Sequence, residues 1–483
     1  MIDFRPVGYV IGLLVSALGA TMLVPMVVDM FVGNGHWPVF LESAVITCLS
    51  GGLVAIACAN GRAGQLTLQQ TFLVTSLVWV VMPVFGGLPF VFGATASSAT
   101  DAFFEAMSGL TTTGATVLSG LDEMPHGLLL WRSLLQWFGG IGIIVVAMVF
   151  LPALRIGGMQ IFRSEAFDTQ GKILPRAAEI AARISWIYLG LTVAAFIMYA
   201  AVGMTAFEAL CHALTSISTG GFSTTDASFA AFKGAPEYVA VVIMVFASLP
   251  FVLYVHMLAG SARALWTDPQ VRTFIGVLLV ISAALTLHQT VIDDRALGLA
   301  FREALFNTVS ITSGTGYAST DYQAWGAFPI CLFFFMGLIG GCAGSTSCSI
   351  KIFRYQLLFS VIGAQIRRIH SPNGVFSPRY AGRTIDDDVI SSVIAFFVLF
   401  TVSLGVLAIL LGITGLDFIS SISGAASALA NIGPGLGPEI GPVGNYGGLN
   451  DTAKWLLAIA MWIGRLELLA VYVLLTVNFW RAA

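Results

Sequence analysis

Long apolar runs separated by short polar loops dominate this chain. A helix needs about 20 apolar residues to cross the hydrocarbon core of a bilayer, and ten stretches approach that length. They cover residues 7–31, 40–59, 69–92, 127–152, 181–203, 237–260, 271–290, 328–358, 389–412 and 453–478. The pattern predicts an all-α polytopic membrane protein.

Four shorter amphipathic stretches lie between the later runs. They are Asp101–Leu110, Ala206–Ile217, Arg302–Thr312 and Phe418–Ala430. Because each is too short to cross a bilayer, we expect re-entrant helices. A short glycine-bearing segment follows each one, and another span follows that segment. The unit of span, re-entrant helix, glycine strand and span therefore occurs four times.

These units divide the chain into five parts. We expect an N-terminal two-helix hairpin followed by four pore repeats, the second starting with a cytoplasmic loop and the third containing an intramembrane loop. The boundaries are 1–68, 69–152, 153–260, 261–358 and 359–483. Irregular backbone at membrane depth is tolerated only where it is buried or lines a water-filled cavity. The four repeats should therefore close around one pore with pseudo-fourfold symmetry.

Composition agrees with a membrane protein. Of 483 residues, 57% are hydrophobic and 10% are charged, whereas soluble domains carry about 25% charged residues. The net charge of −3 argues against a nucleic-acid partner. Neither a P-loop nor a dinucleotide-binding glycine motif occurs, and the six histidines are scattered. We therefore expect neither an enzyme nor a cofactor bound by this chain.

The basic residues indicate orientation. Lys and Arg concentrate in segments 153–180 and 351–384, and the positive-inside rule places such loops in the cytoplasm. Both termini then lie in the cytoplasm, and the four glycine strands face the outside. The first apolar run is long enough to span and lacks a convincing cleavage pattern, so we expect it to remain as a helix.

The four glycine strands are candidates for binding a cation. Their residues are Thr112, Thr113 and Gly114; Thr219, Gly220 and Gly221; Gly314, Thr315, Gly316 and Tyr317; and Asn431, Ile432 and Gly433. Aligned on Gly114, Gly220, Gly316 and Gly433, they lie 106, 96 and 117 residues apart. Glycine tolerates positive φ, which lets backbone carbonyls turn inward, and carbonyl rings replace the hydration shell of potassium. Helix packing explains an isolated membrane glycine, but not four glycines in one repeated context.

Acidic side chains accompany the re-entrant helices. They are Asp101, Glu105, Glu208, Glu303 and Asp417. Carboxylates near a pore mouth raise the local cation concentration, whereas carboxylates at the start of a helix cap its free N–H groups. Both interpretations are open.

The eighth apolar run is interrupted by ten small residues from position 340 to position 349. The candidate gate comprises Gly340, Gly341, Cys342, Ala343, Gly344, Ser345 and Thr346. Each glycine costs a helix about 1 kcal/mol relative to alanine, and a helix broken inside the bilayer must face a cavity. The alternative is a kinked helix packed on its neighbours.

Arg465 is the second candidate for controlling the pore. It lies well inside the last apolar run, where an ionised side chain is costly and usually faces the protein interior or water. The alternatives are a buried pair with Glu467 or a side chain that reaches the interface. Glu467 is also the main intramembrane carboxylate available for coupling to a second ion.

The glycine strands resemble the four filter strands of the Trk/Ktr/HKT superfamily of potassium transporters. The matching segments are Thr-Thr-Thr-Gly-Ala at 111–115, Ser-Thr-Gly-Gly-Phe-Ser at 218–223, Gly-Thr-Gly-Tyr-Ala-Ser at 314–319 and Asn-Ile-Gly-Pro-Gly-Leu-Gly at 431–437. The N-terminal hairpin and Gly-Arg-Leu-Glu at 464–467 resemble the TrkH type more than the shorter KtrB type.

The resemblance implies a potassium-selective pore in a bacterial inner membrane, paired as a homodimer. It also implies that the loop at 340–349 obstructs the pore, that Arg465 forms a barrier beneath the filter, and that a cytosolic nucleotide-binding ring protein of the TrkA type docks on the basic segments. Cys348 and Ser349 depart from the family pattern, which usually has glycines there. The sequence thus predicts gated potassium uptake, with a proton- or sodium-coupled symporter of the same fold as the alternative.

Overall fold

The computed structural model describes residues 2–63, 66–147, 157–159, 173–258, 260–261 and 263–481. Within this part of the chain, seven helices are long and apolar enough to cross a membrane, or eight if one bent pair is counted as a span. The only regular β structure among these residues is a hairpin of β1 (Arg379–Tyr380) and β2 (Arg383–Thr384), with Arg379 opposite Thr384. The prediction of an all-α polytopic membrane protein is confirmed.

The N-terminal hairpin consists of α1 (Arg5–Thr21), α2 (Leu23–Val32) and α3 (Trp37–Ala57). Glycines bring the backbones of α1 and α3 together. A Cβ on Gly12 would lie 2.6 Å from the backbone nitrogen of Ala55, and a Cβ on Gly51 would lie 2.6 Å from that of Ser16. Such close approach of backbones gives membrane helices van der Waals contact.

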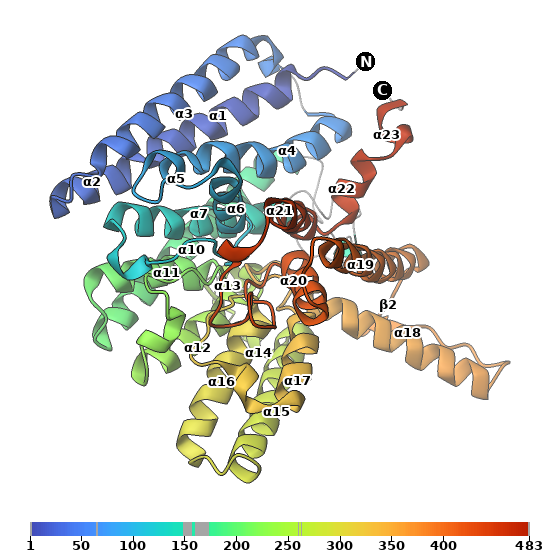
Figure 1. The fold of residues 1–483 in the computed structure, drawn as a ribbon. Helices are drawn as coiled ribbons and strands as arrows, with labels where there is room; N and C mark the ends of the chain where they lie inside the picture. Colours follow the sequence, from blue (N-terminus) through green and yellow to red (C-terminus); the bar gives the residue numbers. More distant parts are fainter. Residues whose placement is uncertain are drawn as a thin grey trace.

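The remaining helices form four groups that follow one another in chain order around a central axis (Figure 1). The first group is α4 (Leu68–Gly86), α5 (Leu88–Phe92), α6 (Ala99–Leu110) and α7 (His126–Val145), and the second is α10 (Ile173–Ala201), α11 (Ala206–Ile217), α12 (Ala235–Ala247), α13 (Phe251–Leu258) and α14 (Arg263–Thr267). The third is α15 (Pro269–Val291), α16 (Leu297–Ser313), α17 (Ala327–Gly337) and α18 (Ile352–His370), and the fourth is α19 (Asp387–Ile413), α20 (Phe418–Ala430), α21 (Asp451–Arg465), α22 (Leu469–Leu474) and α23 (Val477–Arg481).

The short helices α6, α11, α16 and α20 each end where a glycine strand begins. Three of them start with a side-chain cap: Ser98 accepts the N–H of Asp101, Thr205 accepts that of Glu208, and Asp417 accepts those of Ile419 and Ser420. These caps satisfy N–H groups that have no partner within the helix. The opposite ends, which carry partial negative charge, point at the strands.

Three predicted spans are broken. The run 237–260 bends by 88° between α12 and α13, where Pro250 cannot donate a helical hydrogen bond. The run 328–358 leaves its helix after Gly337 and resumes at Ile352. The run 453–478 ends its helix at Arg465, and two residues with positive φ follow. The break in the run 328–358 coincides with the small residues at 340–349 that predicted it, whereas the average hydrophobicity of the other two runs gives no sign of their breaks.

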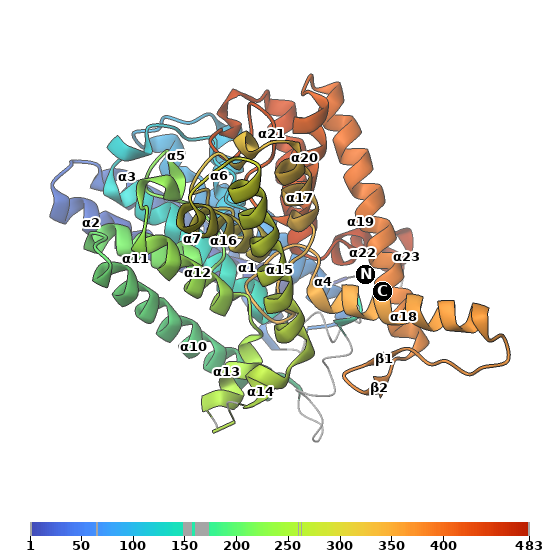
Figure 2. The same cartoon turned by 90° about the horizontal axis from the view of Figure 1, so that it is seen from below.

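Helix α18 projects sideways from the body of the molecule, with the β1–β2 hairpin close by (Figure 2). The two termini lie next to each other in both views. Of the basic segment expected at 153–180, the structure describes only residues 157–159 and the helix backbone from residue 173, so the positions of its basic side chains lie outside the described residues.

Candidate ion-conducting site

The four strands share one backbone pattern. In each strand, two residues separated by one have positive φ. The pairs are Thr112 at 52° with Gly114 at 83°, Thr219 at 51° with Gly221 at 79°, Gly314 at 76° with Gly316 at 81°, and Asn431 at 52° with Gly433 at 108°. In a regular strand successive residues face opposite sides, and so do their carbonyls. Inverting φ at every second residue turns the carbonyls of successive residues toward the same side.

The strands close into a ring. A Cβ added to one glycine of each strand would lie within 2.6 Å of a carbonyl oxygen in the next strand. The distances are 2.3 Å from Gly114 to Gly220, 1.8 Å from Gly221 to Thr315, 2.0 Å from Gly316 to Ile432 and 2.6 Å from Gly433 to Thr113. Each strand thus touches the next, and the fourth touches the first. A side chain at any of these glycines would collide with a neighbouring carbonyl.

This geometry corrects the alignment of the second strand. Gly221, not Gly220, matches Gly114, Gly316 and Gly433 in φ and in its contact. The equivalent glycines therefore lie 107, 95 and 117 residues apart. The double glycine in this strand left the register ambiguous, and the contact with Thr315 resolves it.

Gly220 instead contributes a carbonyl, as do Thr113, Thr315 and Ile432 in the other strands. Its oxygen accepts a hydrogen bond of 2.6 Å from Nε2 of Gln136, and Oε1 of Gln136 accepts the N–H of Phe222 at 3.0 Å. Among the described residues, no side chain donates to the other three carbonyls. Gln136 on α7 therefore anchors the second strand from behind, a role that no local sequence motif signals.

A buried ion pair joins the first two strands. Nε of Arg132 lies 2.8 Å from Oε1 of Glu105, and both side chains are at most 1% exposed. Arg132 also donates to the carbonyl of Ser223 at 2.9 Å and to the hydroxyl of Thr116 at 3.2 Å. These additional hydrogen bonds help to offset the hydration that both charged groups lose on burial. The pair fixes the spacing between the strands above the glycine ring.

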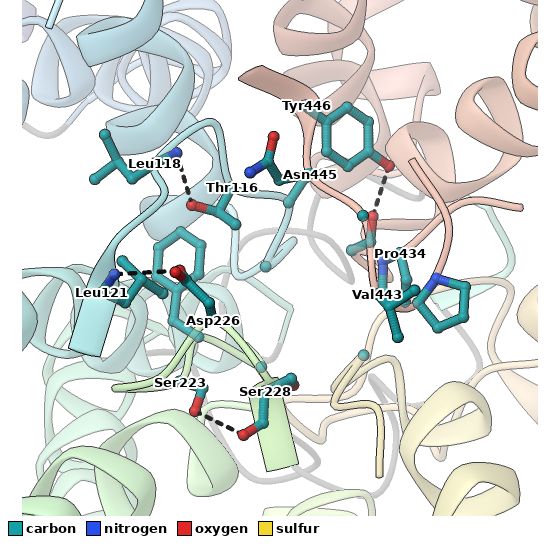
Figure 3. Close-up of a pocket in the computed structure, with 18 of the residues that line it drawn as sticks. Thr116, Leu118, Leu121, Ser223, Asp226, Ser228, Pro434, Val443, Asn445 and Tyr446 are labelled. Atoms are coloured by element: carbon teal, nitrogen blue, oxygen red, sulfur yellow. Dashed lines mark hydrogen bonds between the residues drawn. The ribbon is translucent and has the colours of Figure 1, made fainter. Parts of the chain in front are cut away.

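A cavity of about 230 Å³ lies above the ring. All four equivalent glycines line it, together with segments of the loops that follow the strands. Figure 3 shows Asp226, Ser223 and Ser228 on one side of this cavity and Tyr446, Asn445 and Pro434 on the other. The hydroxyl of Tyr446 donates to the carbonyl of Gly433 over 2.7 Å. The cavity forms a vestibule at the end of the ring opposite Cys348.

The five acidic side chains singled out from the sequence do not line this vestibule. Asp417 and Glu208 cap helices, Glu105 pairs with Arg132, Glu303 pairs with Arg295 at 2.6 Å and Asp101 pairs with Lys454 at 2.6 Å. Helix capping therefore holds for Asp417 and Glu208, whereas Glu105, Glu303 and Asp101 form ion pairs that neither interpretation predicted. The acidic residue that does line the vestibule is Asp226, whose carboxylate accepts the N–H groups of Gly120 and Leu121 at 2.8 and 3.1 Å.

Below the ring, residues 338–351 form a buried loop between α17 and α18. The N–H of Cys342 donates to the carbonyl of Ser248 at 3.0 Å, and the carbonyl of Gly344 accepts the N–H of Phe251 at 2.9 Å. Thr346 donates its hydroxyl to the carbonyl of Ala247 at 2.9 Å. The loop therefore fills the gap left by the bend between α12 and α13, and a single kinked helix is excluded.

Cys348, in the same loop, contacts the ring of glycine strands. Its sulfur lies 3.5 Å from the hydroxyl of Thr112, and a Cβ on Gly314 would lie 2.9 Å from its Cβ. The N–H of the next residue, Ser349, donates to the carbonyl of Ala430 at 2.8 Å. Segments of the first, third and fourth groups of helices thus meet at Cys348 and Ser349.

Arg465 reaches the same point from α21. One guanidinium nitrogen donates to the sulfur of Cys348 at 2.9 Å, and the other donates to the carbonyl of Gly139 at 3.2 Å. The side chain is 3% exposed, and its Nε has no hydrogen-bond partner among the described residues. The guanidinium is therefore buried between the loop and α7 on the Cys348 side of the ring, and it does not reach the interface.

Glu467 pairs with Arg354 of α18 rather than with Arg465. Nε of Arg354 also donates to the carbonyl of Gly157 at 2.8 Å, and its guanidinium lies 3.9 Å from the ring centre of Phe396. Lys351, at the end of the loop, donates to the carbonyl of Ser347. Three cations and one carboxylate therefore lie around the inner side of the loop.

The sequence is similar to those of known cation transport proteins. Residues 36–481 match the family described as TrkH, cation transport protein. The chain is 44% identical to the Trk system potassium uptake protein TrkI of Halomonas elongata, over 85% of this chain and 84% of that protein. It is 36% identical to the Trk system potassium uptake protein TrkH of Escherichia coli K12, over 99% of both chains.

The fold is also similar to a solved structure. The crystal structure of the potassium transporter TrkH from Vibrio parahaemolyticus matches with a TM-score of 0.91 and 35% sequence identity, covering 99% of this chain and all of that one.

Proposed function

Because the chain belongs to the TrkH family of cation transport proteins, we propose that it takes up potassium through the ring formed by its four glycine strands. The observation that carries this proposal is the closed set of contacts in which Gly114, Gly221, Gly316 and Gly433 each meet a carbonyl of the next strand. Four inward carbonyls at one level suit an ion that must shed its water.

Three contributions favour conduction, two from the chain and one from the membrane. The carbonyls of the ring compensate for lost hydration. The C-terminal ends of four short helices add partial negative charge beneath the vestibule. The membrane potential drives inward movement, contributing about 2.3 kcal/mol per unit charge for each 100 mV. No nucleophile or proton donor has to act at the ring.

The loop at 340–349 and Arg465 limit conduction in this proposal. A guanidinium beneath the filter repels a cation that has just lost its water. The loop closes the path because Cys348 lies against Thr112 and Gly314. Opening requires Cys348 to leave Thr112 and Gly314 and to give up its hydrogen bond with Arg465.

Coupling to protons or sodium is the weaker proposal. It needs an intramembrane carboxylate that exchanges partners, and Glu467 was the candidate. Its carboxylate is engaged by the guanidinium of Arg354, whose side chain is only 1% exposed. Separating that pair would leave a buried charge uncompensated.

A homodimer in the bacterial inner membrane, with both termini in the cytoplasm, completes the proposal. Helix α18 supports dimerisation, because Phe359, Ile362, Ile366 and Ile369 lie on one face and are 43–72% exposed. Arg367 and Arg368, also exposed on α18, offer a basic surface to a cytosolic nucleotide-binding ring protein of the TrkA type. To test this basic surface, binding of purified ring protein to vesicles that contain this chain is measured. The binding should be lost when Arg367→Glu is combined with Arg368→Glu.

The decisive experiment compares rubidium and sodium uptake by purified protein in liposomes. Gly316→Ser should lower the preference for rubidium because the new Cβ meets the Ile432 carbonyl. Gly326→Ser is the matched control, since Gly326 has φ of 102° and no neighbour within 4 Å. Unchanged selectivity in Gly316→Ser would refute the filter. Uptake that follows an imposed pH or sodium gradient at fixed voltage would support the symporter instead.

A further inference from the structure

An apolar cavity of about 490 Å³ lies between α1, α4 and α7, apart from the vestibule. Its walls include Leu14 and Ala17 of α1, Val78 and Trp79 of α4, and Phe138 and Gly142 of α7. The volume falls in the range of about 300–1,000 Å³ typical of small-ligand sites. Apolar walls of this kind do not retain water.

The cavity opens toward the bilayer. Leu14 at its edge is 38% exposed, and Ala17 is also exposed. The helices α1, α4 and α7 are each part of a stretch long and apolar enough to cross the membrane. The opening therefore faces hydrocarbon rather than water.

The walls offer no free hydroxyl to an occupant. The hydroxyl of Thr75 has no hydrogen-bond partner among the described residues, but it is covered by its neighbours and does not face the cavity. The hydroxyls of Thr21 and Ser185 donate to carbonyls of their own helices at 2.7 and 2.8 Å. An occupant therefore meets an apolar surface, which favours a hydrocarbon chain over a polar ligand.

The inner wall of the cavity belongs to the pore. Gly139 lines the cavity, and its carbonyl accepts the hydrogen bond from Arg465. Trp79 also lines it, and its ring centre lies 5.7 Å from the guanidinium carbon of Arg465. An occupant of the cavity therefore packs against Gly139 and Trp79, which both contact Arg465.

We propose that the cavity binds one acyl chain of a membrane phospholipid, held by apolar contacts along its length. A helix of another subunit does not fit: at about 10 Å across it would occupy roughly 800 Å³ in each 10 Å of length. A flexible hydrocarbon chain fits both the volume and the lateral opening. The ligand contributes van der Waals contact that an empty apolar cavity would forfeit.

Photolabelling tests this site without relying on transport. The purified protein is reconstituted in phosphatidylcholine vesicles that contain a small fraction of phosphatidylcholine with a diazirine in its acyl chain, and labelled peptides are mapped. We expect label on the segments of α4 and α7 that contain Trp79 and Gly142. Gly142→Leu should remove most of it by filling the cavity, since a Cβ there meets Trp79 at an ordinary 3.6 Å.

Ala17→Phe closes the same cavity from α1 and provides a second variant if Gly142→Leu is poorly folded. Gly276→Leu on α15 is the control, because Gly276 has no neighbour within 4 Å, and it should label like the unaltered protein. Equal labelling in all variants would overturn the proposal. A cross-link between two chains at Ala17 in place of lipid label would assign the face to a second copy and would overturn it as well.

Discussion

Arg465 donates a hydrogen bond of 2.9 Å to the sulfur of Cys348, which joins α21 to the loop between α17 and α18 directly beneath the ring of glycine strands. The two residues are 117 positions apart in the chain. In the proposed mechanism it holds the pore closed.

Cys348→Ala should increase rubidium uptake into liposomes in the absence of any partner protein. A hydrogen bond to a charged group contributes about 1.5–3 kcal/mol, and each 1.4 kcal/mol corresponds to tenfold in an equilibrium. The open state should gain roughly tenfold or more. Cys331→Ala is the control, because Cys331 is an exposed cysteine on the preceding helix. Equal uptake in the two variants would show that the contact does not restrain the gate.

Gly221→Ala should abolish potassium selectivity, because its Cβ would lie 1.8 Å from the carbonyl oxygen of Thr315. Rubidium and sodium uptake measured in parallel gives the selectivity. Gly234→Ala carries a comparable positive φ of 95° but meets no atom within 4 Å, so it controls for backbone strain. Retained selectivity in Gly221→Ala would refute the corrected register.

Gln136→Ala should weaken selectivity while leaving the fold intact. It removes the two hydrogen bonds that hold Gly220 and Phe222 in place, so the second carbonyl of the ring gains freedom and discriminates less between ion sizes. The measurement is the rubidium-to-sodium uptake ratio. Gln69→Ala, which removes a bond to the distant carbonyl of Phe479, should leave that ratio unaltered. A ratio that changes equally in both variants would argue for a general loosening instead.

Glu105→Gln should destabilise the protein strongly. It leaves the buried Arg132 without its counter-charge, and breaking a buried pair costs about 3–5 kcal/mol. The midpoint of thermal unfolding in detergent should fall accordingly. Asp3→Asn disrupts an exposed pair whose side chains are 65% and 55% exposed, and exposed pairs contribute about 0–1 kcal/mol. Similar midpoints for the two variants would contradict a structural role for Glu105.

Ile366→Glu combined with Ile369→Glu should convert a dimer into a monomer, because both side chains lie on the exposed apolar face of α18 and are 62% and 72% exposed. Light scattering of the detergent complex gives the oligomeric state. Val375→Glu, beyond the helix and 94% exposed, is the control. A dimer that persists in the double variant would place the subunit interface elsewhere.

The membrane class, the four short helices and the glycine strands were all predictable from linear patterns. The hydrocarbon core imposes a minimum apolar length on each span and forbids unpaired backbone groups at lipid-exposed positions. Both constraints leave a local record: ten apolar runs, four short amphipathic stretches and four glycine segments at similar spacing. The position of Arg465 within an apolar run likewise marked it as a residue of the interior.

The register of the second strand, the partners of Arg465 and Glu467 and the role of Gln136 were not predictable in this way. Gly220 and Gly221 are chemically identical neighbours, and the oxygen of Thr315 distinguishes them from 94 residues further along the chain. Glu467 lies two residues from Arg465 but pairs with Arg354, because the helix ends between them and the chain turns through two residues of positive φ. Contacts of this kind arise only when distant segments pack, and local periodicity carries no record of them.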